Sequence, residues 1–254
     1  MVFEPGDLVV LIDRKGKRHL MRLTGGKERL DKVGVVDTDA LMGQADGAVV
    51  HIGSASLTAL TPTVLDKVAA IHRKAQIIVP RDAALIALHA DVKAGDHVIE
   101  GGAGSGALSI VLLHLLRPGG RLITYELRAD HAQVAQSNVE RAGLCDNHEI
   151  HIGNIAEDIA ETDVDSTILD VPEPWEAVPA CYKALAPGGR FVSFSPTIGQ
   201  VEKTHHALKE KEMADIHTFE VLERELVVGK GGTRPSFEML GHTGYITSAR
   251  KLGE

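Results

Sequence analysis

The 254-residue chain predicts an α/β protein, in which a Rossmann-like sheet follows a small β-rich domain. The main observation is a glycine-rich turn, Gly101–Gly106, between a short apolar strand at His97–Ile99 and a helical run at Ala107–Leu116. A second strand, Arg121–Tyr125, completes a βαβ unit, and further strands alternate with helices to the end of the chain. Such a sheet binds its ligand above the carboxyl ends of the strands.

The segment 1–62 is predicted to form the small β-rich domain, because short strands separated by glycines are typical of a little barrel or sandwich. The expected strands are Leu8–Ile12, His19–Leu23, Val33–Val36 and Ala48–Ile52. Between Arg14 and Lys32, eight lysines or arginines face two acids, Glu28 and Asp31. This basic segment fits either solvated hairpin turns or a surface that follows the backbone of an RNA.

A second domain is expected over 63–254, with the boundary near Pro62. Its first helices are predicted at Val64–His72, with Thr63 as N-cap, and at Arg81–His89. Basic residues near the entrance of this domain are Lys67, Arg73, Lys74 and Arg81. Beyond Glu126 the expected helices are Ala129–Ala142, Pro179–Ala186 and Val201–Lys211, and the expected strands are Glu149–Ile152, Thr167–Leu169, Arg190–Phe194, Phe219–Val228 and Gly244–Ser248.

Composition limits the possible partners and compartments. The first thirty residues do not resemble a signal peptide, and no apolar run is long enough to span a bilayer, so we expect no membrane association. Two cysteines and thirteen histidines match no disulfide or metal pattern, which predicts a cytoplasmic protein without a metal. The net charge of −8 argues mildly against nucleic acid, although the position of the basic residues matters more than their sum.

Two acids flank the glycine-rich turn. Glu100 precedes the turn, and Glu126 ends the next strand, where a carboxylate can accept both ribose hydroxyls of an adenosine. Gly102, Gly104 and Ala107 also fit the dinucleotide fingerprint, so the turn alone leaves NAD open as a ligand. Together with Glu100 and the features described next, the turn resembles that of class I methyltransferases, which bind S-adenosylmethionine.

The strongest chemical motif is Asp170–Trp175, DVPEPW, after the strand that ends at Leu169. As an isolated turn it would be a proline-stiffened loop with a tryptophan in the core. Here Asp170 is expected above the same crevice as the glycine turn, with its backbone held by the prolines that follow. Amino-methyltransferases of nucleobases place an Asp or Asn followed by prolines and an aromatic residue at this point.

Over nearly its whole length the chain resembles the tRNA (adenine-58-N1)-methyltransferase family in its archaeal and bacterial single-subunit branch. The resemblance rests on Gln76-Ile77-Ile78, Glu100–Gly106, Tyr125-Glu126, Leu169–Trp175, Pro196-Thr197, Gln200-Val201, Arg234-Pro235 and the tail Gly241–Tyr245. The Gly241–Tyr245 tail and the DVPEPW stretch are the most specific of these motifs. The resemblance implies S-adenosylmethionine as cofactor, tRNA as partner, a homotetramer, and a Rossmann-like class I methyltransferase domain with a small N-terminal β domain.

The resemblance also implies a set of site residues. The cofactor contacts fall on Gln76, Glu100, Gly102, Gly104, Ser105, Gly106, Ala107, Leu108, Glu126, His131, Asn154 and Asp170. His131 stands where many members have arginine, and Asn154 replaces the acid that lies beside the adenine of the cofactor, although an amide oxygen can still accept a hydrogen bond. Asp170 takes the catalytic position, and Trp175, Tyr245 and Arg234 are the candidate substrate contacts.

The implied reaction follows from the chemistry of adenine. N1 offers a lone pair once base pairing is broken, and a carboxylate at Asp170 can accept the exocyclic N6–H and stabilise the cationic product. The base must leave the T-loop, and Trp175 and Tyr245 either contact it or pack in the core. Two alternatives remain: a methyltransferase for a small molecule or protein, and a non-catalytic tRNA-binding subunit, which the intact glycine turn and Asp170 disfavour.

Overall fold

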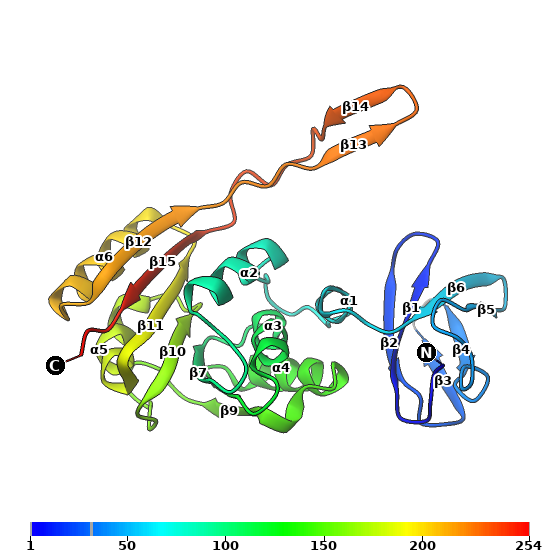
Figure 1. The fold of residues 1–254 in the computed structure, drawn as a ribbon, viewed down its shortest axis with the longest axis horizontal. Helices are drawn as coiled ribbons and strands as arrows, with labels where there is room; N and C mark the ends of the chain where they lie inside the picture. Colours follow the sequence, from blue (N-terminus) through cyan, green and yellow to red (C-terminus); the bar gives the residue numbers. More distant parts are fainter. Residues whose placement is uncertain (1, 31–32, 254) are drawn as a thin grey trace.

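The computed structural model describes residues 2–30 and 33–253, which form two groups of strands joined by a helical linker (Figure 1). In the N-terminal group, β1 (Leu8–Asp13), β2 (Arg18–Arg22), β5 (Val49–Ile52) and β6 (Ala55–Leu60) form an antiparallel sheet in the order β2-β1-β6-β5. A separate hairpin pairs β3 (Lys27–Leu30) with β4 (Gly34–Asp37). The core of this group contains Phe3, Val9, Leu11, Met21 and Leu57.

The sequence patterns missed two strands of this group. β3 has three exposed residues out of four and lacks an apolar run, while β6 contains small and hydroxylated residues although it pairs with both β1 and β5. These strands are held by their neighbours rather than by their own residue preferences. The strands of this group end at Leu60, which is in keeping with a division at Pro62; that division stays a prediction.

Helix α1 (Val64–Ala69) follows, and it begins at a capping box in which the Thr63 hydroxyl accepts from the Asp66 amide while the Asp66 carboxylate bonds back to Thr63. The predicted extension to His72 is wrong. The helix ends at Ala69, because the His72 amide donates instead to Asn138 Oδ1 at 2.9 Å. Helix α2 (Pro80–His89) begins one residue earlier than predicted, with proline at its first position.

The second group of strands forms a seven-stranded sheet in the order β12-β15-β11-β10-β7-β8-β9. Five strands are parallel neighbours, and β15 runs antiparallel between β11 and β12. The bounds are β7 His97–Gly101, β8 Arg121–Glu126, β9 His148–Ile152, β10 Val164–Leu169, β11 Leu185–Ser195, β12 Ala214–Glu220 and β15 Tyr245–Arg250. The predicted α/β class with a Rossmann-like sheet is confirmed.

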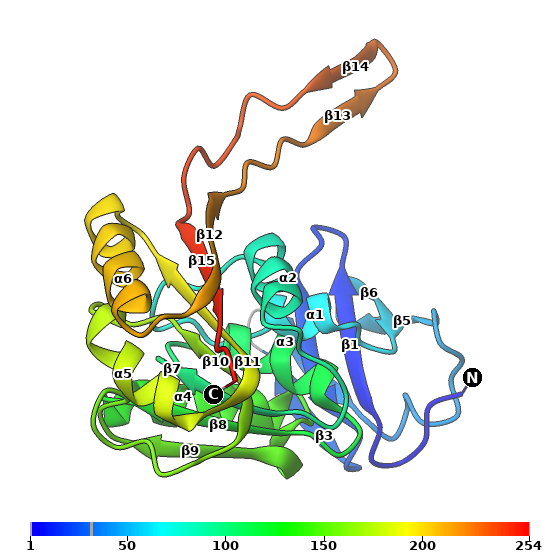
Figure 2. The same ribbon diagram turned by 60° about the vertical axis from the view of Figure 1, so that its left-hand side comes forward.

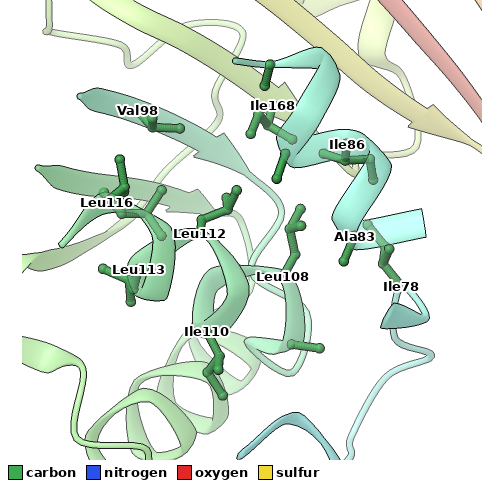
Figure 3. Packing of buried hydrophobic residues seen from close by; sticks show 14 of the residues in the cluster. Ile78, Ala83, Ile86, Val98, Leu108, Ile110, Leu112, Leu113, Leu116 and Ile168 are labelled. Atoms are coloured by element: carbon green, nitrogen blue, oxygen red, sulfur yellow. The ribbon is translucent and has the colours of Figure 1, made fainter. Parts of the chain in front are cut away.

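Helices cover both faces of this sheet (Figure 1). On one face lie α2, α3 (Ala107–Leu116) and α4 (Ala129–Arg141), which a short 3-10 helix at Cys145–Asn147 follows. Figure 3 shows Ile86, Leu108 and Leu112 from these helices packed toward Val98 and Ile168 of the sheet. On the other face, α5 (Pro174–Ala184) and α6 (Ile198–Glu210) pack on the alternate side chains of the same strands.

Helix α5 corrects the prediction for the DVPEPW stretch. The helix begins at Pro174 rather than at Pro179, because proline is favoured in the first turn, where its missing N–H has no partner to lose. Trp175 is therefore a helical residue, and Pro179 lies inside the helix. The segment Pro187–Gly189, predicted to close the helix, instead forms an irregularity in β11, where the register against β10 shifts.

The last predicted strand pair is correct in its pairing and wrong in its extent. β12 ends at Glu220 and pairs with β15, whereas residues 226–235 form a separate hairpin of β13 (Leu226–Gly229) and β14 (Gly232–Pro235). We call residues 221–241 the arm. Figures 1 and 2 show that the arm projects away from the rest of the chain. In the described residues, no helix is long and apolar enough to cross a membrane.

Candidate active site

The glycine-rich turn lies at the carboxyl end of β7, and three of its four glycines adopt positive φ angles, +88° at Gly102, +51° at Gly104 and +78° at Gly106. A Cβ on Gly102 would lie 2.1 Å from the carbonyl oxygen of Asp170, and one on Gly106 would lie 3.1 Å from the backbone of Ala135. A Cβ on Gly104 would meet no atom within 4 Å. Packing therefore requires two of the glycines, while the third leaves one side of the turn open to a ligand.

Glu126, at the end of β8, holds this turn. Its Oε2 accepts from the amides of Ala103 at 2.9 Å and Gly104 at 3.3 Å, and its Oε1 accepts from the Arg128 amide at 2.9 Å. A carboxylate has about four lone-pair positions, so roughly one remains for a ligand hydroxyl. The predicted hydrogen bonds from both ribose hydroxyls to Glu126 would therefore compete with the amide bonds by which Glu126 holds the turn.

Glu100 lies beneath the turn and is 1% exposed. Its Oε2 accepts from the hydroxyls of Ser109 at 2.6 Å and Thr124 at 2.8 Å, which ties α3 to β8. Burial raises the pKa of Glu100 to about 7, and the carboxylates of Asp170 and Glu126 add to the shift. The geometry places Glu100 as a support for the turn, with its contacts inside the protein.

The linker between α1 and α2 is fastened to the glycine turn. Ser105 Oγ accepts from the amides of Lys74 at 3.0 Å and Ala75 at 3.1 Å. The Asn138 side chain accepts from the His72 amide and donates to the carbonyls of His72 and Ser105, each at 2.9 Å. These bonds hold the linker that carries Gln76, which lines the cavity described next; its role as a cofactor contact stays a prediction. Asn138 was missed, because its partners lie far away in the sequence.

A cavity of about 220 Å³ opens beside the turn. Asp170 lies at the end of β10 with its amide bonded to the Gly101 carbonyl at 2.8 Å, and it lines the cavity together with Gln76. Asp170 is an exposed residue at the cavity, although many protein atoms surround its carboxylate. The resulting loss of water, and then the charge of Glu126, raise the pKa of Asp170 to about 6. The other lining residues are Ile77, Ile78, Val79, Phe194, Pro196, Leu240 and Thr243.

The tail at Gly241–Tyr245 builds one wall of this cavity. His242 lies between the Glu220 carboxylate and the carbonyl of Pro196, which its Nε2 reaches at 2.8 Å. A Cβ on Gly244 would lie 2.4 Å from the Phe194 ring, so only glycine lets the chain lie flat on that ring. The tail therefore fixes Phe194 and Thr243 in the wall of the cavity.

Comparison with known proteins agrees with this geometry. The family model described as the tRNA methyltransferase complex GCD14 subunit matches residues 55–231, and a TrmI-like N-terminal model matches residues 2–50. The chain belongs to this tRNA methyltransferase family. The sequence-based assignment is thereby confirmed.

Individual relatives cover nearly the whole chain. The tRNA (adenine(57)-N(1)/adenine(58)-N(1))-methyltransferase TrmI of Methanocaldococcus jannaschii is 36% identical over 95% of this chain and 94% of its own. A Thermotoga maritima structure described as an S-adenosylmethionine-dependent O-methyltransferase has a TM-score of 0.85 at 32% identity, covering 100% and 96% of the two chains. The tRNA (m1A58) methyltransferase TrmI of Aquifex aeolicus has a TM-score of 0.78 at 26% identity and covers both chains completely.

Three residues that the resemblance assigned to the substrate do not line the cavity of this family member, as far as the described residues define it. Trp175 donates to Glu176 at 2.8 Å, and the Lys203 ammonium lies 4.3 Å from its ring. Arg234 is in the arm, where its guanidinium lies over the Phe237 ring. Tyr245 begins β15, and its ring contacts His242 beside the cavity wall.

Two of the assigned cofactor residues lie around the ends of β8 and β9. His131 is half-buried in the first turn of α4. Asn154 Oδ1 accepts from the Ala156 amide at 3.1 Å, and its Nδ2 donates to Glu157 at 3.2 Å, so this side chain shapes its own turn. Sequence reasoning missed Leu127 and Ile152, which are 73% and 65% exposed directly at these strand ends. For Leu127, the available signal was its place directly after the strand-ending acid Glu126.

Within the described ranges, no group of three or more His, Cys, Asp or Glu side chains is placed to hold a metal ion.

Proposed function

We propose that the protein transfers the methyl group of S-adenosylmethionine to N1 of adenine 58 in the T-loop of tRNA. The observation that carries the proposal is that Gln76 and Asp170 line one cavity, and that the backbone of Asp170 bonds to Gly101 and packs against Gly102 of the glycine turn, in a member of this family. The M. jannaschii relative is named for both adenine 57 and adenine 58, so modification of adenine 57 as well is part of the proposal.

The residues present fit the cofactor. Gly104 leaves the turn open, and Gly106 at the start of α3 makes no side-chain cap, so the amides of Ala107 and Leu108 are available to a carboxylate. The exposed side chains of Leu127 and Ile152 provide apolar surface for an adenine ring beside Glu126. When bound, the cofactor supplies an electrophilic methyl group on a sulfonium.

The cavity suits a flipped adenine. Apolar residues provide most of its wall, and Asp170 places a carboxylate at its end. As a carboxylate, Asp170 accepts the N6–H of the base and stabilises the positive charge that develops on the ring. N1 carries no proton to remove, so the main work of the protein is to position the base and exclude water.

The alternative acceptor is a hydroxyl group, as in the description of the T. maritima structure. A hydroxyl must lose its proton during transfer, and Asp170 is the one ionisable side chain among the described lining residues. The names of the TrmI relatives favour tRNA over this acceptor.

The test is methyl transfer from labelled S-adenosylmethionine to unmodified tRNA transcripts. We expect 1-methyladenosine in the T-loop, no labelling at position 58 when that adenine is replaced, and a loss on the order of 100-fold or more in Asp170→Ala. Asp215→Asn, an exposed carboxylate on β12, serves as the control with unchanged activity. Label in another nucleoside, or full activity of Asp170→Ala, would contradict the assignment.

We also propose that the chain forms a homotetramer in the cytoplasm and that copies meet through the arm. All residues of β13 and β14 are exposed, and a lone two-stranded hairpin is marginal in water. Within the arm, Leu226, Val228 and Phe237 are 64%, 77% and 84% exposed. Their side chains form an apolar surface of the kind that marks contacts between proteins. Light scattering should give a tetramer for the wild type and smaller species for Leu226→Lys/Val228→Lys; a monomeric wild type would refute the proposal.

A further inference from the structure

Three cationic side chains meet where the N-terminal strands join the methyltransferase sheet. Arg22 at the end of β2 and Arg117 after α3 both contact Gly143: a Cβ there would lie 2.9 Å from Arg22 Nη2, and Arg117 Nη2 donates to the Gly143 carbonyl at 2.8 Å. Lys67 belongs to α1, which contacts both β2 and α3 (Figure 1), and it lies close enough to Arg117 and Arg22 for their charges to act on its ammonium group. We call Arg22, Lys67 and Arg117 the junction cluster.

Among the described residues, Arg117 is the one member of the junction cluster that has an acidic partner. Other basic side chains of β2 and the linker have acidic partners: Arg18 pairs with Asp66, and Lys74 pairs with Asp130. Among the described residues, in contrast, the Lys67 ammonium makes no hydrogen bond or ion pair. Arg22 donates to a backbone carbonyl, and the one acid near Arg117 is Asp146 at 3.5 Å, whose side chain is 83% exposed.

The repulsion within the junction cluster is visible in the pKa of Lys67. Partial burial, and then the charges of Arg117 and Arg22, lower the pKa of the Lys67 ammonium. An anion placed among the three groups would relieve the repulsion and supply the missing acceptor. Arg22 and Arg117 are exposed, so such an anion can arrive from solvent.

The surroundings indicate what kind of anion this is. The cluster is open rather than enclosed, and β2 belongs to the basic segment between Arg14 and Lys32 that the sequence singles out. Arg22 comes from the N-terminal sheet, Lys67 from the linker helix α1 and Arg117 from the end of α3, so a ligand that bridges them spans the junction. An extended polyanion, which carries a line of phosphates, meets these conditions better than a small ion, which occupies one point of the junction.

We propose that the junction cluster binds a backbone phosphate of the RNA substrate, away from the base that is methylated. The proposal rests on the proposed function for its choice of RNA. Arg117 lies at the far end of α3 from the glycine turn, and ten helical residues span about 15 Å, so this contact positions the RNA without touching the reacting atoms. It also reconciles an anionic substrate with a chain of net charge −8.

The test measures tRNA binding by Lys67→Gln, Lys67→Arg and Lys209→Gln at several salt concentrations. Lys209 is an exposed lysine on α6, on the opposite face of the sheet, and is the matched control. We expect Lys67→Gln to weaken binding on the order of tenfold and to reduce the slope of log affinity against log salt by about 1, with kcat at saturating tRNA unchanged. Lys67→Arg, which keeps the positive charge, should retain the wild-type tRNA affinity and salt slope.

Binding is measured without methyl transfer, so the result does not depend on which nucleoside is modified. Equal affinity and salt slope in Lys67→Gln and Lys209→Gln would overturn the proposal. So would calorimetry in which inorganic phosphate binds the wild type and not Lys67→Gln while tRNA affinity is unaffected, because the cluster would then be a small-ion site. Failure of the proposed function would appear separately, as tRNA that the wild type binds but does not methylate.

Discussion

Replacing Gly102 with alanine tests the closest approach in the active site. Gly102 adopts φ +88°, which costs an alanine about 1–2 kcal/mol. The new Cβ would also lie 2.1 Å from the Asp170 carbonyl oxygen, where real Cβ atoms do not come closer than about 3 Å. Neither backbone can move freely, because Gly102 donates to the Tyr125 carbonyl and Asp170 donates to the Gly101 carbonyl, both at 2.8 Å.

The overlap adds a repacking cost of about 1–3 kcal/mol, so Gly102→Ala should destabilise the fold by about 2–5 kcal/mol in total. For a chain of this size, the melting temperature should fall on the order of 10 °C. The strain should also displace Asp170, and a shift of about 1 Å at a positioned group can cost on the order of 100-fold in rate.

Gly104→Ala is the matched comparison, because its φ of +51° is also left-handed while its Cβ would meet no protein atom within 4 Å. We expect a smaller loss of melting temperature, roughly 5 °C, together with a weaker cofactor affinity in calorimetry. Scanning calorimetry and the tRNA methylation assay measure both variants. A Gly102→Ala protein that melts with the wild type and keeps its rate would refute this reasoning.

Three other predictions concern the hydrogen bonds of Ser105 and the raised pKa values of Asp170 and Glu100. Ser105→Ala leaves the amides of Lys74 and Ala75 without their acceptor, so stability should fall by about 1–3 kcal/mol and the KM for S-adenosylmethionine should rise, whereas a wild-type melting curve and KM would contradict that role. The pKa of Asp170 is raised to about 6, and the proposed mechanism uses its carboxylate form. The value of kcat/KM should therefore rise with pH through about 6, and Asp170→Asn should remove that limb of the profile. Folding raises the pKa of Glu100 from 4.5 to about 7, so the folded state binds this proton more tightly than the unfolded state. The free energy of unfolding should therefore fall by roughly 3 kcal/mol as pH rises from about 4.5 to about 7. Denaturation curves of Glu100→Gln should lack this fall.

The parts of the site that the sequence predicts are those with local signals. The glycine turn between a strand and a helix, Glu126 and Asp170 each stand directly at a strand end, so their convergence follows from the rule for parallel sheets. The observed bounds of α3, Ala107–Leu116, match the prediction because an apolar run ends at a Pro-Gly-Gly break.

The parts that the sequence does not predict depend on distant partners. Nothing near Asn138 indicates that it holds His72, and nothing near Ser105 indicates that its hydroxyl accepts from Lys74 and Ala75. The start of α5 at Pro174 could have been predicted from the preference of proline for the first helical turn. The arm has no such signal, because the apolar alternation of an exposed hairpin looks like that of a sheet strand.

The fastening of the linker to Ser105 has a consequence for any attempt to define a minimal enzyme. A fragment that starts at Pro80, the first residue of α2, would keep all seven strands of the methyltransferase sheet. It would nevertheless lose Gln76, Ile77, Ile78 and Val79, which line the cavity. The smallest fragment that retains the whole cavity therefore has to start at or before His72, the linker residue that is hydrogen-bonded to Asn138.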